Sequence, residues 1–509
     1  MNAALLATES LEKYGDYLAY HFEGRDYYTR GQLHFAAQLA RFLHDRGVRP
    51  DDPVVLLMPN CPETLAGFHA VWRLGAIITP ITPQLGPREI AYVLKHSEAK
   101  AVITVPELVD RVKAAWPEAP ALKHLLVFGP SDTPGAQNIL PEPLQAHGVE
   151  KFVPRDKSDV AFLLYTSGTT GNPKGVLLTH GNVIANHRAV ASTGRLKERS
   201  WTVLTLPLSH SYGVMIMNVC YVSGCSAVVL PKFDPAGILS AVEKFRVTRF
   251  AMVPTMLVRL VNFPDVEKFD VSSLEIVHSG AAPLPNEIRV RFEERFRCRV
   301  FDNYGQSESS PSLSGYHESE RIRPGSVGHA LPGITIEIQD PKGQPLPPFE
   351  PGEICARGPN IMKGYLKNDE ATREALRGGW LHTGDVGYLD NEGYLFITDR
   401  MKDIIIKGAE NISPREIEEA LYEHPAVDEV AVIGVPDSEY GETICAVVSA
   451  KANQSLTQDD LTAHLNSRIT KFKTPSHYIF REALPKNANG KLDRKMLRAE
   501  LKQFFAPAG

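Results

Sequence analysis

Short apolar runs alternate with longer amphipathic stretches along most of this chain, and this alternation limits the folds open to it. Runs typical of buried strands occur at 54–58, 76–79, 101–104, 125–128, 227–230, 249–253 and 276–279. Between them, apolar residues recur at helical spacing at 30–47, 61–74, 87–97 and 234–245. Because strands that alternate with helices form parallel sheets, the pattern predicts an α/β fold.

Two later regions follow other patterns. Residues 325–365 are rich in Gly and Pro, with alternating runs at 335–339 and 352–357, which predicts a small β subdomain. Beyond residue 403 the pattern indicates a small α+β unit. Its expected elements are a short strand, a helix at 414–423, strands at 429–435 and 442–450, a helix at 457–470 and a strand near 478–480.

We therefore expect a large N-terminal domain of stacked α/β sheets over 1–398, which includes the β subdomain, and a small mobile α+β domain over 404–509. The boundary at 399–403 is rich in charged residues and has no Gly/Ser tether. A short charged boundary predicts a defined hinge rather than a flexible linker.

The charge balance and the cysteines restrict the function classes. The 509 residues include 55 basic and 60 acidic side chains, and the net charge of −5 is not that of a general nucleic-acid binder. We expect no nucleic-acid partner. The six cysteines form no CxxC pair, and the first residues lack a basic signal-peptide region, so we expect a reduced, cytoplasmic location.

One long apolar stretch has two interpretations. Residues 214–230 have the length of a membrane span, but polar residues and Gly224 interrupt them, and a span needs ~20 mostly apolar residues. We expect instead a buried helix at 214–221, a turn at Gly224 and a buried strand at 226–230. No integral membrane segment is therefore predicted.

A glycine-rich loop follows the apolar run that begins at residue 160. Glycines allow a tight turn that aims backbone N–H groups at one point, and four hydroxyls and a lysine add donors there, which suits a polyphosphate. The spacing is not that of a Walker A loop, and a polar turn between two strands is the alternative. The residues concerned are Thr166, Ser167, Gly168, Thr169, Thr170, Gly171 and Lys174.

This loop is the first of five blocks that resemble, in order, those of the adenylate-forming superfamily of acyl-CoA synthetases, aryl-CoA ligases and firefly luciferase. The blocks lie at 165–175, 302–311 (D-N-Y-G-Q-S-E-S-S-P), 380–390 (W-L-H-T-G-D-V-G-Y-L-D), 399–416 and 485–491 (P-K-N-A-N-G-K). The resemblance implies an ATP-dependent acid:CoA ligase that forms an acyl-adenylate and then a thioester, with ATP, Mg²⁺ and coenzyme A. A non-catalytic nucleotide-binding protein is the alternative from another class, and the polar residues retained in all five blocks argue against it.

The resemblance also implies roles for particular residues. Glu308 and Thr169 would hold Mg²⁺, Ser307 would bond the α-phosphate or the acyl oxygen, and Asp385 and Arg400 would bind the ribose. Lys491 would enter the active site during adenylation, with Lys486 as a weaker alternative. The adenine would lie among Gly280, Ala281, Ala282, Asp302, Asn303, Tyr304 and Gly305, where Asn303 replaces the usual glycine.

For the second half-reaction, the resemblance implies that the small domain rotates about Lys402. The segment with Lys407, Gly408 and Ala409 would then replace Lys491 beside the substrate. We expect the nucleotide of coenzyme A to contact Tyr440, Lys471, Phe472 and Lys473, although Thr474 and Ser476 stand where some relatives carry basic residues.

The acid substrate should occupy a pocket near the stretch without Asp or Glu between Trp201 and Phe233. An amino acid would need a carboxylate partner there for its ammonium group. We expect a medium- or long-chain fatty acid, and an aryl or cinnamate-type acid is the alternative. A separate carrier protein could replace coenzyme A as the acceptor. The chain could also form a homodimer. The pocket residues would be His210, Tyr212, Val214, Met215, His278, Gly280 and Ser312, with His210 also catalytic beside Lys491, Ser307 and Glu308.

Overall fold

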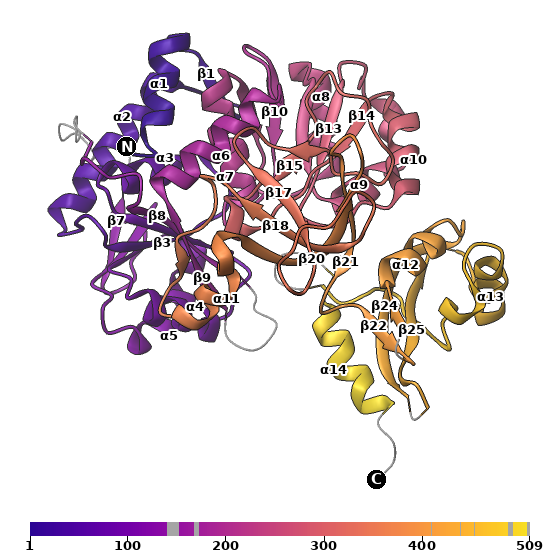
Figure 1. The fold of residues 1–509 in the computed structure, drawn as a ribbon. Helices are drawn as coiled ribbons and strands as arrows, with labels where there is room; N and C mark the ends of the chain where they lie inside the picture. The colour runs from indigo at the N-terminus through magenta and orange to yellow at the C-terminus, as the bar shows by residue number, and fades with distance from the viewer. Residues whose placement is uncertain are drawn as a thin grey trace.

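The structure, a computed structural model, describes residues 1–139, 152–166, 173–408, 410–437, 439–451, 453–486 and 492–505. Its largest sheet has eight strands in the order β19-β9-β8-β4-β3-β5-β6-β7 (Figure 1). The central strands pair in parallel, and β8, β9 and β19 pair antiparallel. The strands are β3 (Pro53–Leu57), β4 (Ile77–Ile81), β5 (Ala101–Thr104), β6 (His124–Phe128), β7 (Ala136–Ile139), β8 (Val160–Thr166), β9 (Lys174–Thr179) and β19 (Gly364–Tyr365).

Helices connect the parallel strands of this sheet and bury their apolar faces in the core. They are α3 (Pro62–Arg73), α4 (Pro87–Ser97) and α5 (Val109–Ala115), and α2 (Thr29–Asp45) leads from β2 (Arg25–Tyr28) of another sheet into β3. Every buried side chain of α3 points into a densely packed interior, where Trp72 and Phe68 are fully buried. The alternation predicted from the sequence is therefore confirmed as an α/β arrangement.

Two smaller sheets, β10-β11-β1-β2 and β12-β13-β14, complete the α/β part. Their strands are β1 (Leu18–Phe22), β2 (Arg25–Tyr28), β10 (Trp201–Leu204), β11 (Ser226–Val229), β12 (Arg249–Met252), β13 (Ile276–Ser279) and β14 (Arg299–Asp302). The neighbouring helices are α1 (Leu5–Tyr14), α6 (His180–Ser192), α7 (Ser211–Ser223), α8 (Pro235–Phe245), α9 (Pro254–Val261) and α10 (Asn286–Phe296). Since β13 and β14 run in parallel, the residues that follow them emerge at the same sheet edge.

The predicted β subdomain is an antiparallel sheet in the order β17-β18-β20-β21. Its strands are β17 (Thr335–Gln339), β18 (Gly352–Arg357), β20 (Leu381–Leu389) and β21 (Leu395–Arg400), with β15 (Ser314–Gly315), β16 (His329–Ala330) and α11 (Asp369–Ala375) nearby. Short 3₁₀ helices are η1 (Pro106–Leu108), η2 (Trp116–Glu118), η3 (Val266–Lys268), η4 (Ser307–Ser309), η5 (Arg377–Gly379) and η6 (Lys471–Lys473).

The C-terminal domain continues directly from β21 and forms a separate body beside the larger one, drawn in orange and yellow in Figure 1. It has its own core, in which Ile417, Leu421 and Ile444 are fully buried. Its elements are β22 (Ile405–Lys407), β23 (Glu410–Ile412), α12 (Pro414–Tyr422), β24 (Val427–Asp437), β25 (Gly441–Ala450), α13 (Gln458–Asn466), β26 (His477–Phe480) and α14 (Arg494–Phe504).

The apolar stretch after residue 214 forms a buried helix and a strand, as predicted. Helix α7 has 13 residues, which is shorter than a membrane span, and Gly224 ends it in a left-handed conformation before β11. No helix in the described part of the chain combines the length and the hydropathy that crossing a bilayer requires.

One predicted helix boundary is wrong. The helix expected at 457–470 ends at Asn466, and the backbone N–H groups of Arg468 and Ile469 both turn back to the carbonyl of Leu465. The apolar spacing extends past the helix because Ile469 packs against the same core as the helical leucines. A periodic pattern therefore continued where the helix itself did not.

Candidate functional site

Asp385 of β20 lies in a polar cluster with Tyr304, which follows β14, and Arg400, at the end of β21. Its side chain is only 7% exposed, and its carboxylate oxygens accept from the hydroxyl of Tyr304 (2.6 Å) and lie 3.0 Å from Nε of Arg400. Arg400 itself is 57% exposed, and Asp385 raises the pKa of its guanidinium. A carboxylate has lone pairs left for further donors, so this pair is suited to hold a diol.

The sheet itself presents Asp385. Thr383, Gly384 and Asp385 bulge out opposite the single residue Ile354 of β18. The carbonyl of Ile354 accepts from the Thr383 hydroxyl (2.7 Å), and Oε1 of Glu353 accepts from the backbone N–H of Gly384 (3.1 Å). Gly384 adopts a left-handed φ of 71° that favours glycine. The sequence analysis did not predict this role of Glu353, which lies 31 residues before Gly384, the residue from whose N–H it accepts.

Glu308 forms a second acidic point of the cluster. It lies in η4, its carboxylate accepts from the hydroxyl of Tyr365 (2.9 Å), and Nζ of Lys174 lies 4.9 Å from the centre of the Tyr365 ring. Burial raises the pKa of Glu308, while Tyr365, Arg400 and Lys174 work against that shift. Tyr365 comes from β19, 57 residues away, and no sequence motif pointed to it.

The donor set at Glu308 fits a hard divalent cation. A partly exposed carboxylate with one oxygen engaged by a neutral hydroxyl keeps the oxygen lone pairs that Mg²⁺ prefers. The other residue expected to hold Mg²⁺, Thr169, lies outside the described residues. Ser307, which precedes Glu308 in η4, is partly exposed and remains available to a ligand.

The turns after β13 and β14 lie side by side, as the resemblance implies for an adenine site. Gly280 is buried against Tyr212, whose ring lies 3.3 Å from the position a Cβ would take, and Ala281 has a left-handed φ of 68°. Ala282 is half-buried. A side chain on Gly305 would lie 2.0 Å from the carbonyl oxygen of Pro311, so only glycine fits there. Ala281 in a left-handed conformation and the obligatory Gly305 indicate that the backbone at this edge is under functional constraint.

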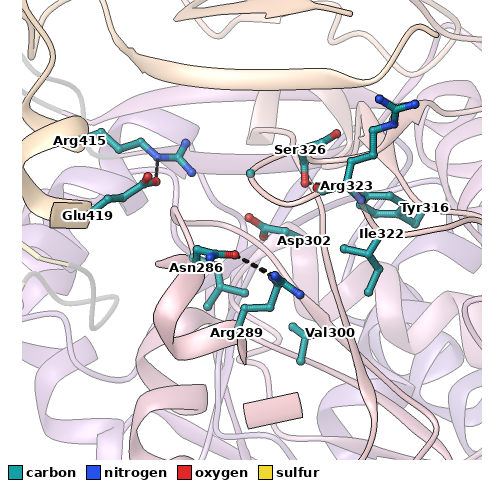
Figure 2. Close-up of a pocket in the computed structure, with 12 residues that line it drawn as sticks. Asn286, Arg289, Val300, Asp302, Tyr316, Ile322, Arg323, Ser326, Arg415 and Glu419 are labelled. Atoms are coloured by element: carbon teal, nitrogen blue, oxygen red, sulfur yellow. Dashed lines mark hydrogen bonds and ion pairs between the residues drawn. The ribbon is translucent and has the colours of Figure 1, made fainter. Parts of the chain in front are cut away.

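Asp302 lines a small pocket of about 40 Å³ between the two domains. Figure 2 shows it between Arg415 and Glu419 of α12 on one side and Asn286 and Arg289 of α10 on the other. Burial raises the pKa of the Asp302 carboxyl to about 7, and the guanidinium of Arg415 works against this shift.

The residues expected to contact the acid lie in and around α7, and they differ in how deeply they are buried. His210 is the N-cap of α7 and is half-buried, and the hydroxyl of Tyr212 donates to the carbonyl of His278 (3.4 Å). Ser312 is buried, and its carbonyl accepts from Asn186 (2.7 Å). Val214 and Met215 are fully buried in the main core, so their contact with an acid stays a prediction.

The residues expected to bind coenzyme A come together on the C-terminal domain. Nζ of Lys407 donates to the carbonyl of Phe472 (3.1 Å) and lies 4.7 Å from the Phe472 ring centre and 5.7 Å from that of Tyr440. Gly408 has a φ of 58°, and a Cβ there would lie 3.0 Å from Tyr440. Lys473 forms an ion pair with Glu416 (2.7 Å), and Lys471 is the exposed first residue of η6. The result is an aromatic and cationic surface of the type that can hold an adenine nucleotide.

The segment that joins the domains is fixed on both sides. The carboxylate of Asp399 accepts from the Ser413 hydroxyl (2.7 Å), and Arg415 donates to the carbonyl of Ile397 (2.8 Å). Asp403 pairs with Arg498 of α14 (2.7 Å), while Lys402 between these contacts is exposed. An exposed residue between two anchored ones is a suitable pivot.

Several predicted residues lie outside the described residues. These are Ser167, Gly168, Thr169, Thr170 and Gly171 of the loop, Ala409, and Lys491. Their flanks are described: Thr166 and Lys174 face each other in the antiparallel pair β8–β9. Lys486, the alternative to Lys491, forms an ion pair with Glu429 (2.8 Å) on the C-terminal domain.

Comparison with known proteins places this chain in a family. The sequence profile described as "AMP-binding enzyme" matches residues 7–366, and "AMP-binding enzyme C-terminal domain" matches residues 416–491. The chain is 35% identical to a long-chain-fatty-acid–CoA ligase of Bacillus subtilis (97% of this chain, 94% of the relative). It is 37% identical to a feruloyl-CoA synthase of Amycolatopsis sp (92% of each).

A solved structure is similar over nearly the whole length. The anthranilate CoA ligase AuaEII in complex with anthranoyl-AMP superposes with a TM-score of 0.93 at 27% identity and covers 99% of this chain and 98% of that one. The two domains and their sheets therefore have a counterpart in a ligase that holds an acyl-adenylate.

Proposed function

The chain belongs to the AMP-binding enzyme family and is an adenylate-forming acid:CoA ligase, and we propose that Asp385, Arg400 and Glu308 form its ATP site. The observation that carries the assignment of residues is the contact of Asp385 with both Tyr304 and Arg400, within electrostatic reach of Glu308. Asp385 accepts the ribose hydroxyls, and Arg400 pairs with its carboxylate. The adenine lies among residues 280–282 and 302–305.

In the first half-reaction a carboxylate oxygen of the acid attacks the α-phosphorus of ATP, and the bond to pyrophosphate breaks. Two anions must meet, so the protein has to neutralise charge and position the groups. Lys174, the hydroxyls at 166, 167, 169 and 170 and the glycines at 168 and 171 hold the phosphates. Ser307 and Lys491 bind the α-phosphate and the acyl oxygen. His210 contacts the acid substrate.

Mg²⁺ would be held by Glu308 and Thr169, where it would neutralise phosphate charge. Tyr365 donates to Glu308 and keeps the carboxylate in place. Lys174 lies over the ring of Tyr365, so these three side chains form one unit at the phosphate end of the site.

In the second half-reaction the sulfur of coenzyme A attacks the acyl carbon, the anhydride bond breaks, and AMP leaves while the thiol proton is lost. We propose that the chain from 404 to 509 rotates about the hinge at 399–403, with Lys402 as pivot, against the domain at 1–398. Lys407, Gly408 and Ala409 then line the thiol path, and Tyr440, Lys471, Phe472 and Lys473 contact the nucleotide of coenzyme A. The clustering of Lys407 with two aromatic rings supports this role.

Two acid classes are proposed. A medium- or long-chain fatty acid agrees with the apolar, acid-free region around α7 and with the Bacillus subtilis relative. An aryl acid is the second candidate, favoured by the similarity to the feruloyl-CoA synthase. The pocket residues are His210, Tyr212, Val214, Met215, His278, Gly280 and Ser312.

The experiment is carboxylate-dependent ATP–pyrophosphate exchange with a panel of acids, followed by addition of coenzyme A. We expect exchange with at least one acid and a thioester on addition of coenzyme A. If exchange occurs without a thioester, but an added carrier protein accepts the acyl group, the acceptor is the carrier protein and not coenzyme A. No exchange with any acid would refute the proposal.

The location and assembly are also proposals. A cytoplasmic location is supported by six free, buried cysteines, because a reducing compartment keeps thiols unpaired. A homodimer is proposed as the assembly and is checked by light scattering. A monomer at working concentration would contradict it.

A further inference from the structure

We propose that Arg195 is a specificity-determining residue at the far end of the acid pocket, and that it receives a second oxygen acceptor carried by the acid. This inference rests on the proposed ligase function. It assigns the substrate class more narrowly: a carboxylic acid with an additional carboxylate, or with a neutral oxygen, remote from the carboxyl that is activated.

Arg195 is a buried cation without a counter-ion in the described part of the chain. It is only 1% exposed, and its Nη2 donates to Oδ1 of Asn303. Nε and Nη1 are buried and have no hydrogen-bond partner among the described residues. An arginine does not escape this cost by losing its proton, because its charge is retained in proteins.

The guanidinium of Arg195 contacts Asn303, which directly follows β14. Asn303 is fixed by its amide, which donates to the carbonyls of Ser279 (2.8 Å) and Phe301 (2.9 Å), so its oxygen is directed at Arg195. A Cβ on Gly315 would lie 2.6 Å from Oδ1 of Asn303 and 3.3 Å from Nη2 of Arg195, so glycine there lets the pair pack against the backbone. Arg195 and Asn303 thus form one polar wall next to β13 and β14.

Tyr212 connects this wall to the pocket. Its ring lies against Gly280, and its hydroxyl donates to the carbonyl of His278 (3.4 Å). Burial lowers the pKa of Arg195, and the Tyr212 hydroxyl works against this shift, which places that hydroxyl near the guanidinium. An acceptor on the acid would enter where the Tyr212 hydroxyl donates to His278.

His278 is a second buried polar side chain beside Arg195. It is 2% exposed, and both of its ring nitrogens lack a partner among the described residues. Burial, with Arg195 as a further cause, lowers its pKa well below the usual value, so the ring is neutral. Two buried side chains from different elements therefore have unused polar atoms beside the same pocket, whereas buried polar groups are normally bonded.

A purely apolar tail would leave these atoms unpaired, whereas an oxygen acceptor would pair them. Sites built to bond a polar group discriminate strongly against analogues that lack it. We therefore expect the enzyme to prefer the acceptor-bearing member of any pair of acids of equal size.

The test measures thioester formation with ATP, Mg²⁺ and coenzyme A for matched pairs of acids. The pairs are straight-chain monoacids against diacids of the same carbon number, and cinnamate against hydroxycinnamate, so that the anionic and neutral acceptors are distinguished. The wild-type enzyme should favour the acceptor-bearing member of at least one series by about 100-fold in kcat/KM. Equal values within every pair would overturn the inference and leave the ligase function intact.

Variants separate a specificity role from a structural one. Arg195→Met should lose the preference but keep exchange with the apolar member, and Arg195→Lys should keep part of the preference for a diacid. Arg188→Met is the matched control, because Arg188 is exposed on α6 and pairs with Glu9 (2.6 Å). An equal loss for both members of a pair in Arg195→Met would contradict the inference. If that variant does not fold in a thermal melt, the wild-type panel alone decides, and activity with no acid at all would refute the proposed function instead.

Discussion

Asp385 and Arg400 face each other across the antiparallel strands β20 and β21, with Nε of the arginine 3.0 Å from Oδ1 of the aspartate. Arg400 is the last residue of β21, and the chain enters the hinge directly after it. The group assigned to the ribose is thus paired with the residue at which the C-terminal domain begins to diverge. Binding of nucleotide and orientation of that domain are expected to influence each other.

Replacing Asp385 by asparagine should weaken ATP binding. The substitution keeps the shape but removes the charge and replaces one of the two carboxylate oxygens, which accept from Tyr304 and pair with Arg400, by an NH2 donor. Loss of hydrogen bonds to a charged group predicts a fall in pyrophosphate exchange of about 10- to 100-fold, mainly through the KM for ATP. Asp369→Asn, at an exposed acid in the first turn of α11, should leave the KM unchanged. An unchanged KM for ATP in Asp385→Asn would contradict the ribose role.

Replacing Tyr365 by phenylalanine should shift the pH profile of exchange. Tyr365 donates to Glu308 and lowers its pKa against the effect of burial. Without the hydroxyl the pKa of Glu308 rises further, so the acidic limb of the profile should move to higher pH. Glu308→Gln should remove that limb and raise the Mg²⁺ concentration needed for exchange. An identical acidic limb in Tyr365→Phe and the wild type would exclude Glu308 as the titrating group.

Asp302 should make the folded protein less stable as the pH rises. Its pKa is about 7 in the folded state, whereas the ordinary value for an aspartate is 3.8. The native state therefore holds the proton more tightly than the unfolded chain does. The stabilisation is fully present below pH 3.8 and is lost as the pH rises to about 7. Thermal unfolding should show wild type losing stability relative to Asp302→Asn as the pH rises from 3.8 to about 7. A difference that does not change with pH would contradict a raised pKa.

Replacing Gly305 by alanine should destabilise the fold. The new Cβ would lie 2.0 Å from the carbonyl oxygen of Pro311 and 2.8 Å from Cα of Ser312, and backbone atoms cannot move aside like a flexible side chain. We expect a loss of about 1–3 kcal/mol in the free energy of unfolding. Gly31→Ala in α2 is the control, since a Cβ there meets no atom within 4 Å and should stabilise the helix by about 0.5–1 kcal/mol.

Replacing Lys491 by alanine should separate the two half-reactions. The C-terminal block assigns this lysine to adenylation alone, so exchange should fall by orders of magnitude. A preformed acyl-adenylate should still react with coenzyme A at nearly the wild-type rate. Single-turnover kinetics with each substrate make the comparison, and an equal loss in both steps would contradict a rotation that exchanges Lys491 for the segment at 407–409.

Sequence reasoning located the residues that belong to local blocks. The helices and strands of the α/β part, the β sheet around 335–357 and the small domain follow from periodicity, while the roles of Asp385, Arg400 and Glu308 are implied by the resemblance of short blocks to those of the superfamily. Local patterns identify such residues because each block forms a single turn or strand end.

Contacts between distant segments could not be predicted in the same way. Tyr365 reaches Glu308, and the Tyr304 hydroxyl reaches Asp385 across 81 residues. Arg195 meets Asn303 across 108 residues, and neither residue has a pattern of its own that predicts the other. These pairings arise from the packing of sheets against one another, which a single sequence does not encode in its spacing.

The most direct test of the central claim is a crystal structure of this protein with ATP and Mg²⁺. The account predicts that the ribose hydroxyls lie against Asp385 and Arg400, the adenine beside residues 280–282, and the phosphates between Glu308 and the loop at 166–174. A nucleotide bound at another surface, with Asp385 still occupied only by Tyr304 and Arg400, would contradict it.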